Sequence, residues 1–311
     1  MKAIVCNRYG QPEDLRIKDV PVPEPKAGEA RIRVKATAIN DYDWSMVTGR
    51  PAVYRIIFGL RRPRRSIPGM ELAGVVDAVG LNVTSFRIGD EVYGDASDHG
   101  LGTFAEYVCV REDGMQIKPA HLTFVQAAAV PHAFCLANQG LQLGSLKPGS
   151  NILINGAGGG VGTFALQLAK QQGATVTGVD TGAKLDGMRA LGFDHVIDYK
   201  LQDFTTTGQR YDLILDTKST RSPSAIAKAL TEEGRYVTVG GEPGLLFRFL
   251  FTGKRFRILA LKANKGLSDV EPLLAQGLRP IIDGPYPLDD VPRLIRYFGE
   301  GKHFGKVVVE V

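Results

Sequence analysis

The segment from Asn151 to Gly162, NILINGAGGGVG, constrains the fold of this chain more than any other. It begins with a short apolar run, breaks into glycines and continues into an amphipathic stretch, 161–172, whose apolar residues include Phe164 and Leu168. Glycines between a strand and a helix are typical of a turn that binds the pyrophosphate of a dinucleotide. The flanking strand and helix argue against a flexible glycine linker or an ordinary tight turn.

The small residues of this turn have separate expected roles. We expect the backbone to bend sharply at Ala157, to approach the pyrophosphate at Gly159 and to let helix pack on strand at Gly162. The start of the helix offers unpaired N–H groups and a partial positive charge to the phosphates. The predicted cofactor-binding residues of the turn are Ala157, Gly158, Gly159, Gly160, Val161 and Gly162.

Composition narrows the class of protein. With 311 residues, 44% of them hydrophobic and 23% charged, the chain is typical of a globular protein with room for two domains. Its start shows no signal sequence and no apolar run reaches membrane-spanning length, so we expect a cytoplasmic protein without a membrane partner. Three cysteines far apart in sequence, Cys6, Cys109 and Cys135, predict reduced thiols rather than a disulfide framework.

The formal net charge of +5 is concentrated in an arginine-rich segment, 50–65. A nucleic-acid-binding surface is one interpretation of such a cluster. Because the segment belongs to no recognisable nucleic-acid-binding fold, we expect a solvated basic loop and no nucleic-acid partner. Attraction of an anionic cofactor or substrate is a further alternative.

The order of elements predicts an α/β protein with two domains. Short strands and turns up to about residue 120 indicate a compact β domain. A helical stretch, 123–143, is followed by five strands separated by helix-length segments, which indicates a doubly wound parallel sheet. The expected strands are 151–155, 175–180, 195–199, 211–216 and 235–239, with a last strand at 306–311.

Several motifs, together with the glycine turn, resemble the medium-chain dehydrogenase/reductase superfamily and, within it, the zinc-independent quinone oxidoreductase-like branch. The resemblance covers nearly the whole chain. It implies a GroES-like β domain, 1–122 completed by 266–311, beside a Rossmann domain, 123–265, with cofactor and substrate in the cleft between them. The motifs are PVPEP at 21–25, PGMELAGVV at 68–76, VTSFRIGDEV at 83–92, GFDHVIDY at 192–199, GRYVTVGG at 234–241 and GKVV at 305–308.

The resemblance also identifies the positions at which zinc-dependent members hold their catalytic metal. Asn40 stands at the first position, Met70 at the second and His132 at the third. One amide, one thioether and one imidazole do not make a zinc site. The segment that corresponds to the structural zinc lobe, 93–107, contains no cysteine. We therefore expect a metal-free protein.

Without zinc to polarise a carbonyl, the hydride acceptor has to be electrophilic itself or activated by hydrogen bonds. Quinones and α,β-unsaturated carbonyls fit this description, so we expect an NAD(P)H-dependent oxidoreductase that reduces one of them. Two alternatives stay open. One is a zinc-free enzyme resembling alcohol or aldehyde dehydrogenases, and the other is a nucleotide-binding redox sensor or interaction protein with little catalysis.

Four residues are candidates for the catalytic site. Asn40 and Asp43 match the Asn-x-x-Asp placement of the family, in which the amide would hold the nicotinamide ribose or the acceptor oxygen and the carboxylate would orient its neighbours. Capping of the next helix is the alternative. A proton must also reach the reduced acceptor, from Tyr54, Tyr42, His132 or solvent. Packing is the alternative for Tyr54, and an interior role with satisfied hydrogen bonds is the alternative for His132.

Three residues bear on the choice of nicotinamide cofactor. Asp180, at the end of the second Rossmann strand, would accept hydrogen bonds from the adenosine ribose and repel a 2′-phosphate. Lys184 and Tyr199 resemble the lysine and tyrosine that flank the 2′-phosphate in NADPH-dependent quinone reductases. Because a carboxylate facing a phosphate is costly, we expect NAD(H) in preference to NADP(H).

The end of the Rossmann domain supplies the remaining expectations. By resemblance, Val239 and Gly240 contact the nicotinamide ring, with a plain strand-to-loop turn as the alternative. The apolar run 245–251 would wall the substrate pocket or form a subunit interface. The superfamily commonly dimerises through the strand that follows, here 258–261, and an unpaired strand edge favours association. We expect a homodimer.

Overall fold

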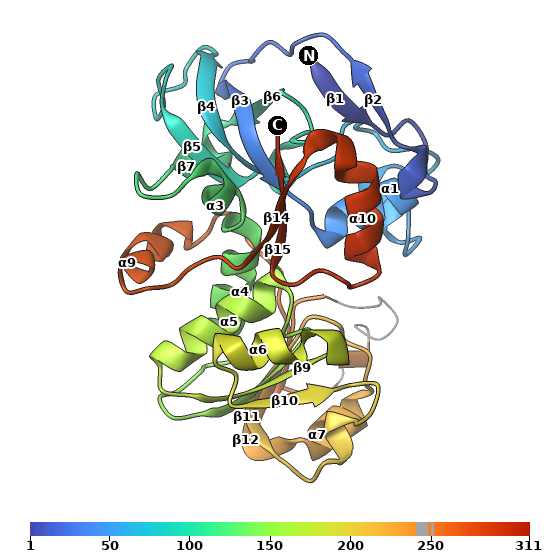
Figure 1. Ribbon diagram of the computed structural model, residues 1–311, viewed down its shortest axis with the longest axis vertical. Helices are drawn as coiled ribbons and strands as arrows, with labels where there is room; N and C mark the ends of the chain where they lie inside the picture. The colour runs from blue at the N-terminus through green and yellow to red at the C-terminus, as the bar shows by residue number, and fades with distance from the viewer. Residues whose placement is uncertain (241–247, 250–251) are drawn as a thin grey trace. The chain divides into compact units, whose positions relative to one another are not determined.

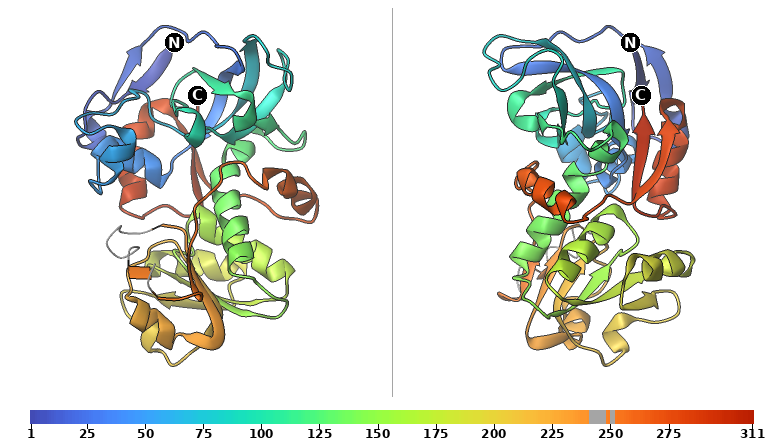
Figure 2. Two further views of the ribbon diagram at one scale, coloured as in Figure 1. Left: turned by 180° about the vertical axis from the view of Figure 1, so that it is seen from behind. Right: turned by 60° about the vertical axis from the view of Figure 1, so that its left-hand side comes forward.

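The computed structural model describes residues 1–240, 248–249 and 252–311, and its contacts divide the chain into two compact units (Figures 1 and 2). Unit 1 consists of Met1–His132, Ala263–Ser268 and Ile282–Val311. Unit 2 consists of Ala133–Lys262 and Asp269–Ile281.

Unit 1 is built on a mostly antiparallel sheet whose strands lie in the order β14-β15-β3-β4-β5-β7, with β6 paired to β3. Alternate residues of β3, among them Ile32 and Val34, are buried, and they pack against Leu72 and Val92 from the neighbouring strands. A separate hairpin pairs β1 (Lys2–Val5) with β2 (Arg16–Asp19). The strands of the larger sheet are β3 (Glu29–Ala38), β4 (Glu71–Val79), β5 (Glu91–Asp95), β6 (Tyr107–Arg111), β7 (Gln116–Ile117), β14 (Ile282–Pro287) and β15 (Lys306–Glu310).

The end of the chain completes unit 1. Strand β15 pairs with β3, and Val308 lies opposite Ala38. Helix α10 (Val291–Gly299) buries Leu294 and Ile295 in a second apolar cluster of this unit. That cluster also receives Val47 from helix α1 (Asp41–Thr48). The short helix α2 (Tyr54–Phe58) follows α1.

Unit 2 is a six-stranded parallel sheet in the order β10-β9-β8-β11-β12-β13. Counted from β8 this is the doubly wound order 3-2-1-4-5-6, in which the strand order reverses between β8 and β11. Helices α5 (Gly160–Gln171) and α6 (Leu185–Leu191) lie beside β8, β9 and β10 (Figure 1). The strands are β8 (Asn151–Asn155), β9 (Thr175–Asp180), β10 (His195–Asp198), β11 (Tyr211–Asp216), β12 (Leu230–Thr238) and β13 (Phe256–Ile258), and the other helices are α7 (Pro223–Lys228) and α9 (Val270–Ala275).

The predicted combination of an antiparallel β domain with a doubly wound parallel sheet is confirmed, but the units divide elsewhere. The helical stretch 123–143 is two helices, α3 (Phe124–Ala128) and α4 (Pro131–Leu143), because proline has no N–H and restricts the residue before it. Helix α3 packs on β3 and β4, so unit 1 extends to His132 rather than to residue 122. Residues 269–281, which include α9, belong to unit 2.

Short 3-10 turns connect many of these elements. No helix of the described part is long and apolar enough to cross a membrane. The 3-10 turns are Pro12–Asp14, Ser97–His99, Glu112–Gly114, Gly182–Lys184, Phe204–Thr206, Leu267–Asp269 and Leu288–Asp290.

The apolar run 245–251 lies outside the described residues apart from Arg248 and Phe249. Phe249 is buried, and its ring stacks on that of Tyr236 with centroids 4.8 Å apart. This phenylalanine therefore belongs to the core of unit 2.

Candidate functional site

The glycine turn of unit 2 joins β8 to α5. The residue in the left-handed region is Gly156, with φ +83°, so the sharp bend falls one residue before the predicted Ala157. A Cβ atom at Gly162 would lie 2.4 Å from the carbonyl oxygen of Ala157, so the close approach of helix and turn leaves no room for a side chain there. Gly159 is the residue that precedes the first turn of α5, as a phosphate-binding turn needs.

Asp180 ends β9 beside this turn. Its Oδ2 atom accepts a hydrogen bond from the backbone N–H of Gly158 (2.9 Å), and its Oδ1 atom accepts one from Thr181 (2.8 Å). The N–H of Gly158 is therefore occupied by Asp180. Because a carboxylate has about four acceptor positions, Asp180 keeps room for a ribose hydroxyl.

Lys184 follows Asp180 by four residues, at the end of the 3-10 turn Gly182–Lys184, and pairs with it. Its Nζ atom is 3.2 Å from Oδ1 of Asp180, and both side chains are buried. Tyr199 donates its backbone N–H to the carbonyl of Asp180 (3.2 Å) and keeps its side chain 45% exposed. The structure thus brings together the three residues on which the choice of cofactor was predicted to depend.

The carboxyl ends of β8, β11 and β12 carry a second polar group in unit 2. Asn155 donates its side-chain amide to Asp216 (2.8 Å), and the backbone N–H of Ser219 donates to the same carboxylate (2.8 Å). Val239 donates its N–H to the carbonyl of Asp216 (3.0 Å), and the carbonyl of Gly240 accepts a bond from the Ser219 hydroxyl (2.6 Å). These contacts place Val239 and Gly240 beside the carboxyl end of β11, one of the two strands that border the switch point of the sheet, where ligands of this fold bind.

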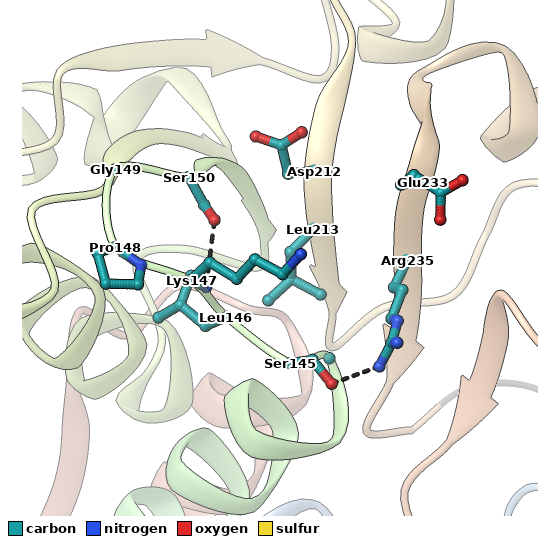
Figure 3. Close-up of a pocket in the computed structure, with 11 residues that line it drawn as sticks. Ser145, Leu146, Lys147, Pro148, Gly149, Ser150, Asp212, Leu213, Glu233 and Arg235 are labelled. Atoms are coloured by element: carbon teal, nitrogen blue, oxygen red, sulfur yellow. Dashed lines mark hydrogen bonds between the residues drawn. The ribbon is translucent and has the colours of Figure 1, made fainter.

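Figure 3 shows a cavity of about 320 Å³ at the opposite, amino-terminal ends of β8, β11 and β12. Its rim carries Lys147 and Arg235 together with Asp212 and Glu233, so the charges balance. Arg235 donates to the hydroxyl of Ser145 across the cavity. No predicted site residue lies there.

In unit 1, Asn40 and Asp43 cap helix α1. One oxygen of the Asp43 carboxylate accepts a hydrogen bond from the backbone N–H of Asn40 (2.9 Å). The other oxygen accepts one from the backbone N–H of Gly69 (2.9 Å). Burial raises the pKa of Asp43 to about 7, against the lowering effect of these two hydrogen bonds. Asn40 and Asp43 therefore form the helix cap that was the alternative interpretation of these residues. Asp43 also holds the loop before β4.

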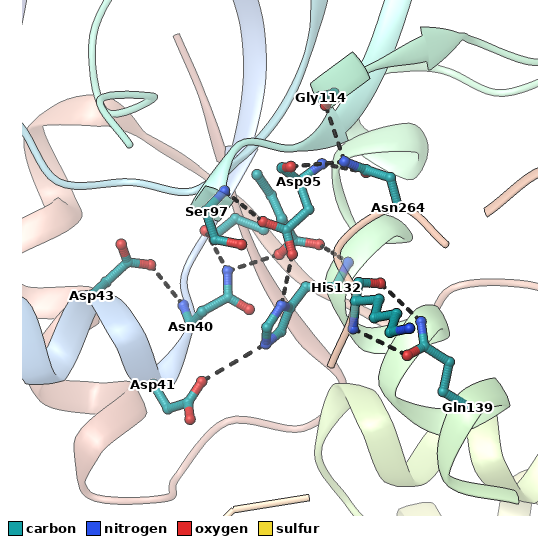
Figure 4. A network of polar contacts seen from close by, with 12 residues as sticks. Asn40, Asp41, Asp43, Asp95, Ser97, Gly114, His132, Gln139 and Asn264 are labelled. Carbon is teal, nitrogen blue, oxygen red and sulfur yellow. Dashed lines mark hydrogen bonds and ion pairs between the residues drawn. The ribbon is translucent and has the colours of Figure 1, made fainter. Parts of the chain in front are cut away.

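His132, the second residue of α4, is buried against two carboxylates of the β sheet (Figure 4). Its Nδ1 atom lies 2.8 Å from Oδ2 of Asp95, and its backbone N–H donates to Glu71 (2.7 Å). The other ring nitrogen, Nε2, is 3.9 Å from Oδ1 of Asp41, whose side chain is largely exposed. The imidazole is thus fixed on one side and directed towards a more open region on the other.

Asp95 is itself held in place. Its backbone N–H donates to Asn264 and its carbonyl accepts from the same side chain, each at 2.8 Å. Burial lowers the pKa of His132, but the hydrogen bond and charge of Asp95 outweigh it and hold this pKa above its usual value. Burial alone would raise the pKa of Asp95, but its hydrogen bond to His132 and the charge of the imidazolium outweigh this effect and hold the pKa below its usual value, so Asp95 stays ionised.

A lysine occupies the place beside Asn40. Lys306, at the start of β15, is buried, pairs with Glu71 and donates to the side-chain oxygen of Asn40. The amide nitrogen of Asn40 donates to Glu71 (2.8 Å). The first of the three family metal positions therefore belongs to an ammonium–carboxylate network. Within the described ranges, no three His, Cys, Asp or Glu side chains are arranged to hold a metal ion.

Tyr42 lies next to His132 and belongs to a cluster of three aromatic rings. Tyr42 packs edge-on to Tyr54 and to Phe58, with ring centroids 5.9 Å apart in both cases, and lies 6.2 Å from the imidazole. Burial, and then the charge of Asp41, raise the pKa of Tyr42 to about 12 and that of Tyr54 above its usual value. Both phenols are therefore protonated hydrogen-bond donors at neutral pH. Tyr54 packs as the alternative interpretation expected, on the ring of Tyr42 that contacts His132.

Sequence reasoning missed several residues of both groups. All but Asn264 are charged or amide residues at the ends of apolar strands, which is the signal that could have indicated them. In the sequence, Lys306 was interpreted only as part of a motif. The missed residues are Glu71, Asp95, Asn155, Asp216, Asn264 and Lys306.

Family models match both units. The model described as the alcohol dehydrogenase GroES-like domain matches residues 26–120, and the one described as zinc-binding dehydrogenase matches residues 191–309. The second match does not contain Asn40, Met70 or His132, so its description says nothing about a metal at those positions.

Relatives and solved structures match the chain along its length. It is 32% identical to a 2-methylene-furan-3-one reductase of Solanum lycopersicum and 32% identical to an NADPH-dependent alkenal/one oxidoreductase, chloroplastic, of Arabidopsis thaliana; each match covers 99% of this chain and 79% of the relative. The structure of the quinone oxidoreductase from Coxiella burnetii superposes with a TM-score of 0.88 at 29% identity, covering 100% of this chain and 99% of that one.

Proposed function

This chain belongs to the medium-chain dehydrogenase/reductase superfamily, in its quinone oxidoreductase-like branch, and we propose that it uses NAD(P)H to reduce a quinone or an α,β-unsaturated carbonyl compound. The observation that carries the proposal is the buried pair of Asp95 and His132, with the ring of Tyr42 beside the imidazole and Tyr54 packed on Tyr42. This set of groups can deliver a proton and hydrogen bonds to an acceptor. It offers no set of ligands that would activate an alcohol through zinc.

The residues of unit 2 fit a dinucleotide. The helix that starts after Gly159 presents its N-terminus to the pyrophosphate, and Asp180 with Tyr199 faces the adenosine half. Val239 and Gly240, at the switch point of the sheet, contact the nicotinamide in this proposal. The bound cofactor supplies the hydride, and the protein supplies orientation and the proton.

His132 donates the proton to the reduced acceptor. Reduction of an enone by hydride leaves an enolate, and reduction of a quinone leaves a hydroquinone anion, so each product needs one proton. Asp95 holds Nδ1, which leaves Nε2 of the imidazolium to release its proton to the anion. The raised pKa of His132 keeps the imidazolium populated near neutral pH.

The acceptor oxygen has to be polarised before the proton arrives. The hydroxyl groups of Tyr42 and Tyr54 are donors in the wall of the same site, and hydrogen bonds of this kind replace the Lewis acid that zinc enzymes use. The amide of Asn40 is already engaged by Glu71 and Lys306. We therefore assign Asn40 and Asp43 to the positioning of α1, on which Tyr42 lies.

The proposed cofactor preference is a modest one for NAD(H). Lys184 neutralises most of the charge with which Asp180 would repel a 2′-phosphate. Asp180 still has an acceptor position for a ribose hydroxyl, which a phosphorylated ribose would not offer in the same place. Both NADH and NADPH should therefore bind, with NADH ahead by a small factor.

The homodimer remains a proposal too. Strand β13 forms one edge of the six-stranded sheet, and a second copy could extend the sheet across that edge. Light scattering of the full chain should then give twice the chain mass of 33.7 kDa. A mass of one chain would contradict the dimer and leave the proposed reaction untouched.

The reaction is tested by following the absorbance of the reduced nicotinamide, with NADH or NADPH and a panel of quinones and enones in one arm, and with NAD+ or NADP+ and simple alcohols in the other. We expect acceptor-dependent oxidation with quinones or enones and none of the reverse reaction with simple alcohols. His132→Asn should lower kcat about 10²-fold or more while dinucleotide binding persists. Binding of cofactor without turnover of any acceptor would overturn the proposal in favour of a sensor or interaction protein.

A further inference from the structure

Helix α2 and the loop after it expose an unusual group of large apolar side chains. Ile56 is 65% exposed, Ile57 59% and Leu60 71%, and Val53 adds 41%. These four residues follow one another within eight positions, so their side chains form a local apolar patch. Scattered exposed apolar residues need no explanation, but a contiguous patch marks a surface that contacts something other than water.

The patch is not a by-product of a poorly packed helix. Phe58 is buried, Tyr54 stacks on it with ring centroids 6.0 Å apart, and both contact Tyr42 of α1. One side of α2 is therefore anchored in unit 1 through Tyr54 and Phe58. Ile56 and Ile57 lie on the other side, where they contribute little to the core.

Arginines surround this patch. Residues 44–70 contain no Asp or Glu, so the segment has no acidic residue of its own to balance them. Arg50, Arg61, Arg62, Arg64 and Arg65 are exposed, and in the described part of the chain no ion pair involves any of the five. We call Val53, Ile56, Ile57 and Leu60 together with these five arginines the α2 surface.

We infer that the α2 surface docks onto an anionic lipid membrane. Apolar side chains that enter the boundary between headgroups and acyl chains, with guanidinium groups at the level of the lipid phosphates, are the two components of interfacial binding. Arginine suits this role because its planar guanidinium binds phosphate in a bidentate manner. The charge of the α2 surface is thus complementary to that of an anionic membrane.

A nucleic acid is the less suitable partner. Phosphates would meet the arginines, but isoleucine and leucine side chains find no counterpart on a phosphate backbone, and the aromatic rings of α2 face inward and are not available for base stacking. A membrane accounts for both the apolar side chains and the arginines of the α2 surface. It also changes the expectation of a solvated basic loop without a membrane partner, since docking needs no spanning helix.

Docking would place the candidate site close to the lipid. Tyr54 is two residues from Ile56 and packs on Tyr42, whose ring contacts His132. An acceptor dissolved in the membrane, such as a lipophilic quinone, would then reach the site from the bilayer; this last step rests on the proposed function. The docking itself does not, so it is tested by binding alone.

The test is co-sedimentation of the full-length protein with vesicles of phosphatidylcholine alone or with about one third phosphatidylglycerol. We expect binding to the anionic vesicles, weakened by salt, and little binding to the neutral ones. Changing Arg61, Arg62, Arg64 and Arg65 together to glutamine should weaken the partition by about fivefold per arginine. The triple variant Ile56→Ser, Ile57→Ser, Leu60→Ser should weaken it as well, at unchanged net charge.

Matched controls separate the surface from general effects of charge and polarity. Glutamine at Lys200, Arg210, Lys228 and Arg257 removes four exposed positive charges from unit 2, and serine at Leu81, Ile88 and Leu201 removes three exposed apolar side chains elsewhere. Both control variants should bind vesicles as the unchanged protein does. Thermal unfolding of every variant verifies that the fold is kept.

Three results would overturn the inference. The first is equal binding to neutral and anionic vesicles, or none to either. The second is loss of binding in the control variants to the same extent. The third is a different partner found while vesicle binding is absent. Binding to a DNA duplex would assign the α2 surface to nucleic acid, and conversion of a dimer into monomers by the apolar triple variant would assign it to a second copy of the chain. Loss of NADH oxidation with vesicle binding intact would count against the proposed function alone.

Discussion

Oδ2 of Asp95 and Nδ1 of His132 are 2.8 Å apart in a buried pair, and the two residues come from different elements, β5 and α4. Asp95 is fixed in turn by two backbone hydrogen bonds with the side chain of Asn264. An ionised carboxylate accepts the Nδ1 proton, so the tautomer and the orientation of the imidazole are both set. Nε2 is left as the nitrogen that can exchange a proton with a substrate.

The pair predicts a shift in the pH dependence of the reaction. The imidazolium is the proton donor, so kcat should be high below the pKa of His132 and fall as the pH rises through it. Asp95 raises that pKa, and Asp95→Asn removes its charge and should move the falling limb of the kcat profile to lower pH by about one unit or more.

Asp41→Asn is the matched control for this measurement. It makes the same chemical change at a carboxylate that lies 3.9 Å from the other ring nitrogen and is 60% exposed. Solvent screening should make its effect on the profile clearly smaller. Equal shifts in the two variants, or a profile that neither variant moves, would show that His132 is not the titrating donor.

The ion pair of Lys184 with Asp180 predicts opposite changes in cofactor preference. Asp180→Ser removes the repulsion of a 2′-phosphate and should move the ratio of kcat/KM for NADPH over NADH upwards by about tenfold. Lys184→Met keeps the volume but leaves Asp180 uncompensated, and should move the ratio downwards by a similar factor. Lys228→Met, an exposed lysine of the same unit, should leave the ratio unchanged. Two changes in the same direction would refute the assignment.

The contact of Gly162 with Ala157 predicts a loss of both stability and cofactor binding. In Gly162→Ala the new methyl would meet a backbone oxygen at 2.4 Å, so α5 has to move away from the turn. We expect the free energy of unfolding to fall by about 1–3 kcal/mol and the Kd for NADH to rise. Gly240→Ala, whose Cβ would be 3.7 Å from the nearest atom, should keep the stability of the unchanged protein. Denaturant titration and fluorescence titration with NADH measure the two effects.

The donor set at Asn40, Met70 and His132 predicts that the enzyme works without zinc. Metal analysis of the purified protein should find well below one zinc per chain, and a strong chelator should leave NADH oxidation unchanged. Inhibition by the chelator that added zinc reverses would contradict the expectation. The buried ammonium of Lys306 beside Asn40 is the structural reason for it, since a second cation at that place would be repelled.

The elements that were predicted well are those whose signal is local. The strand Asn151–Asn155 and the strand Tyr211–Asp216 have the predicted bounds, because short apolar runs between turn residues mark buried parallel strands. Helix α5 begins at Gly160, one residue before the prediction. The single helix expected over 123–143 is two, although Pro131 was visible in the sequence as the reason for the break.

The candidate site was predicted less completely because its contacts are not local. Asn40, Asp43, Tyr54 and His132 could be selected from motifs, and the structure places all four in unit 1. Their partners could not be selected in this way, because the sequence around a carboxylate such as Asp95 does not indicate which side chain it will contact. The engagement of the Asn40 side chain by Lys306 is a contact over 266 positions.

The sequence by itself determined the glycine turn, the doubly wound sheet and the incomplete set of zinc ligands at the family positions, because glycine sterics, hydrophobic periodicity and ligand chemistry depend on residue type and short spacing. Only the tertiary structure decided that Lys184 pairs with Asp180, that Asp95 orients His132 and that the apolar side of α2 faces solvent among arginines. Those relationships follow from the direction and burial of side chains, which packing sets across distant parts of the chain.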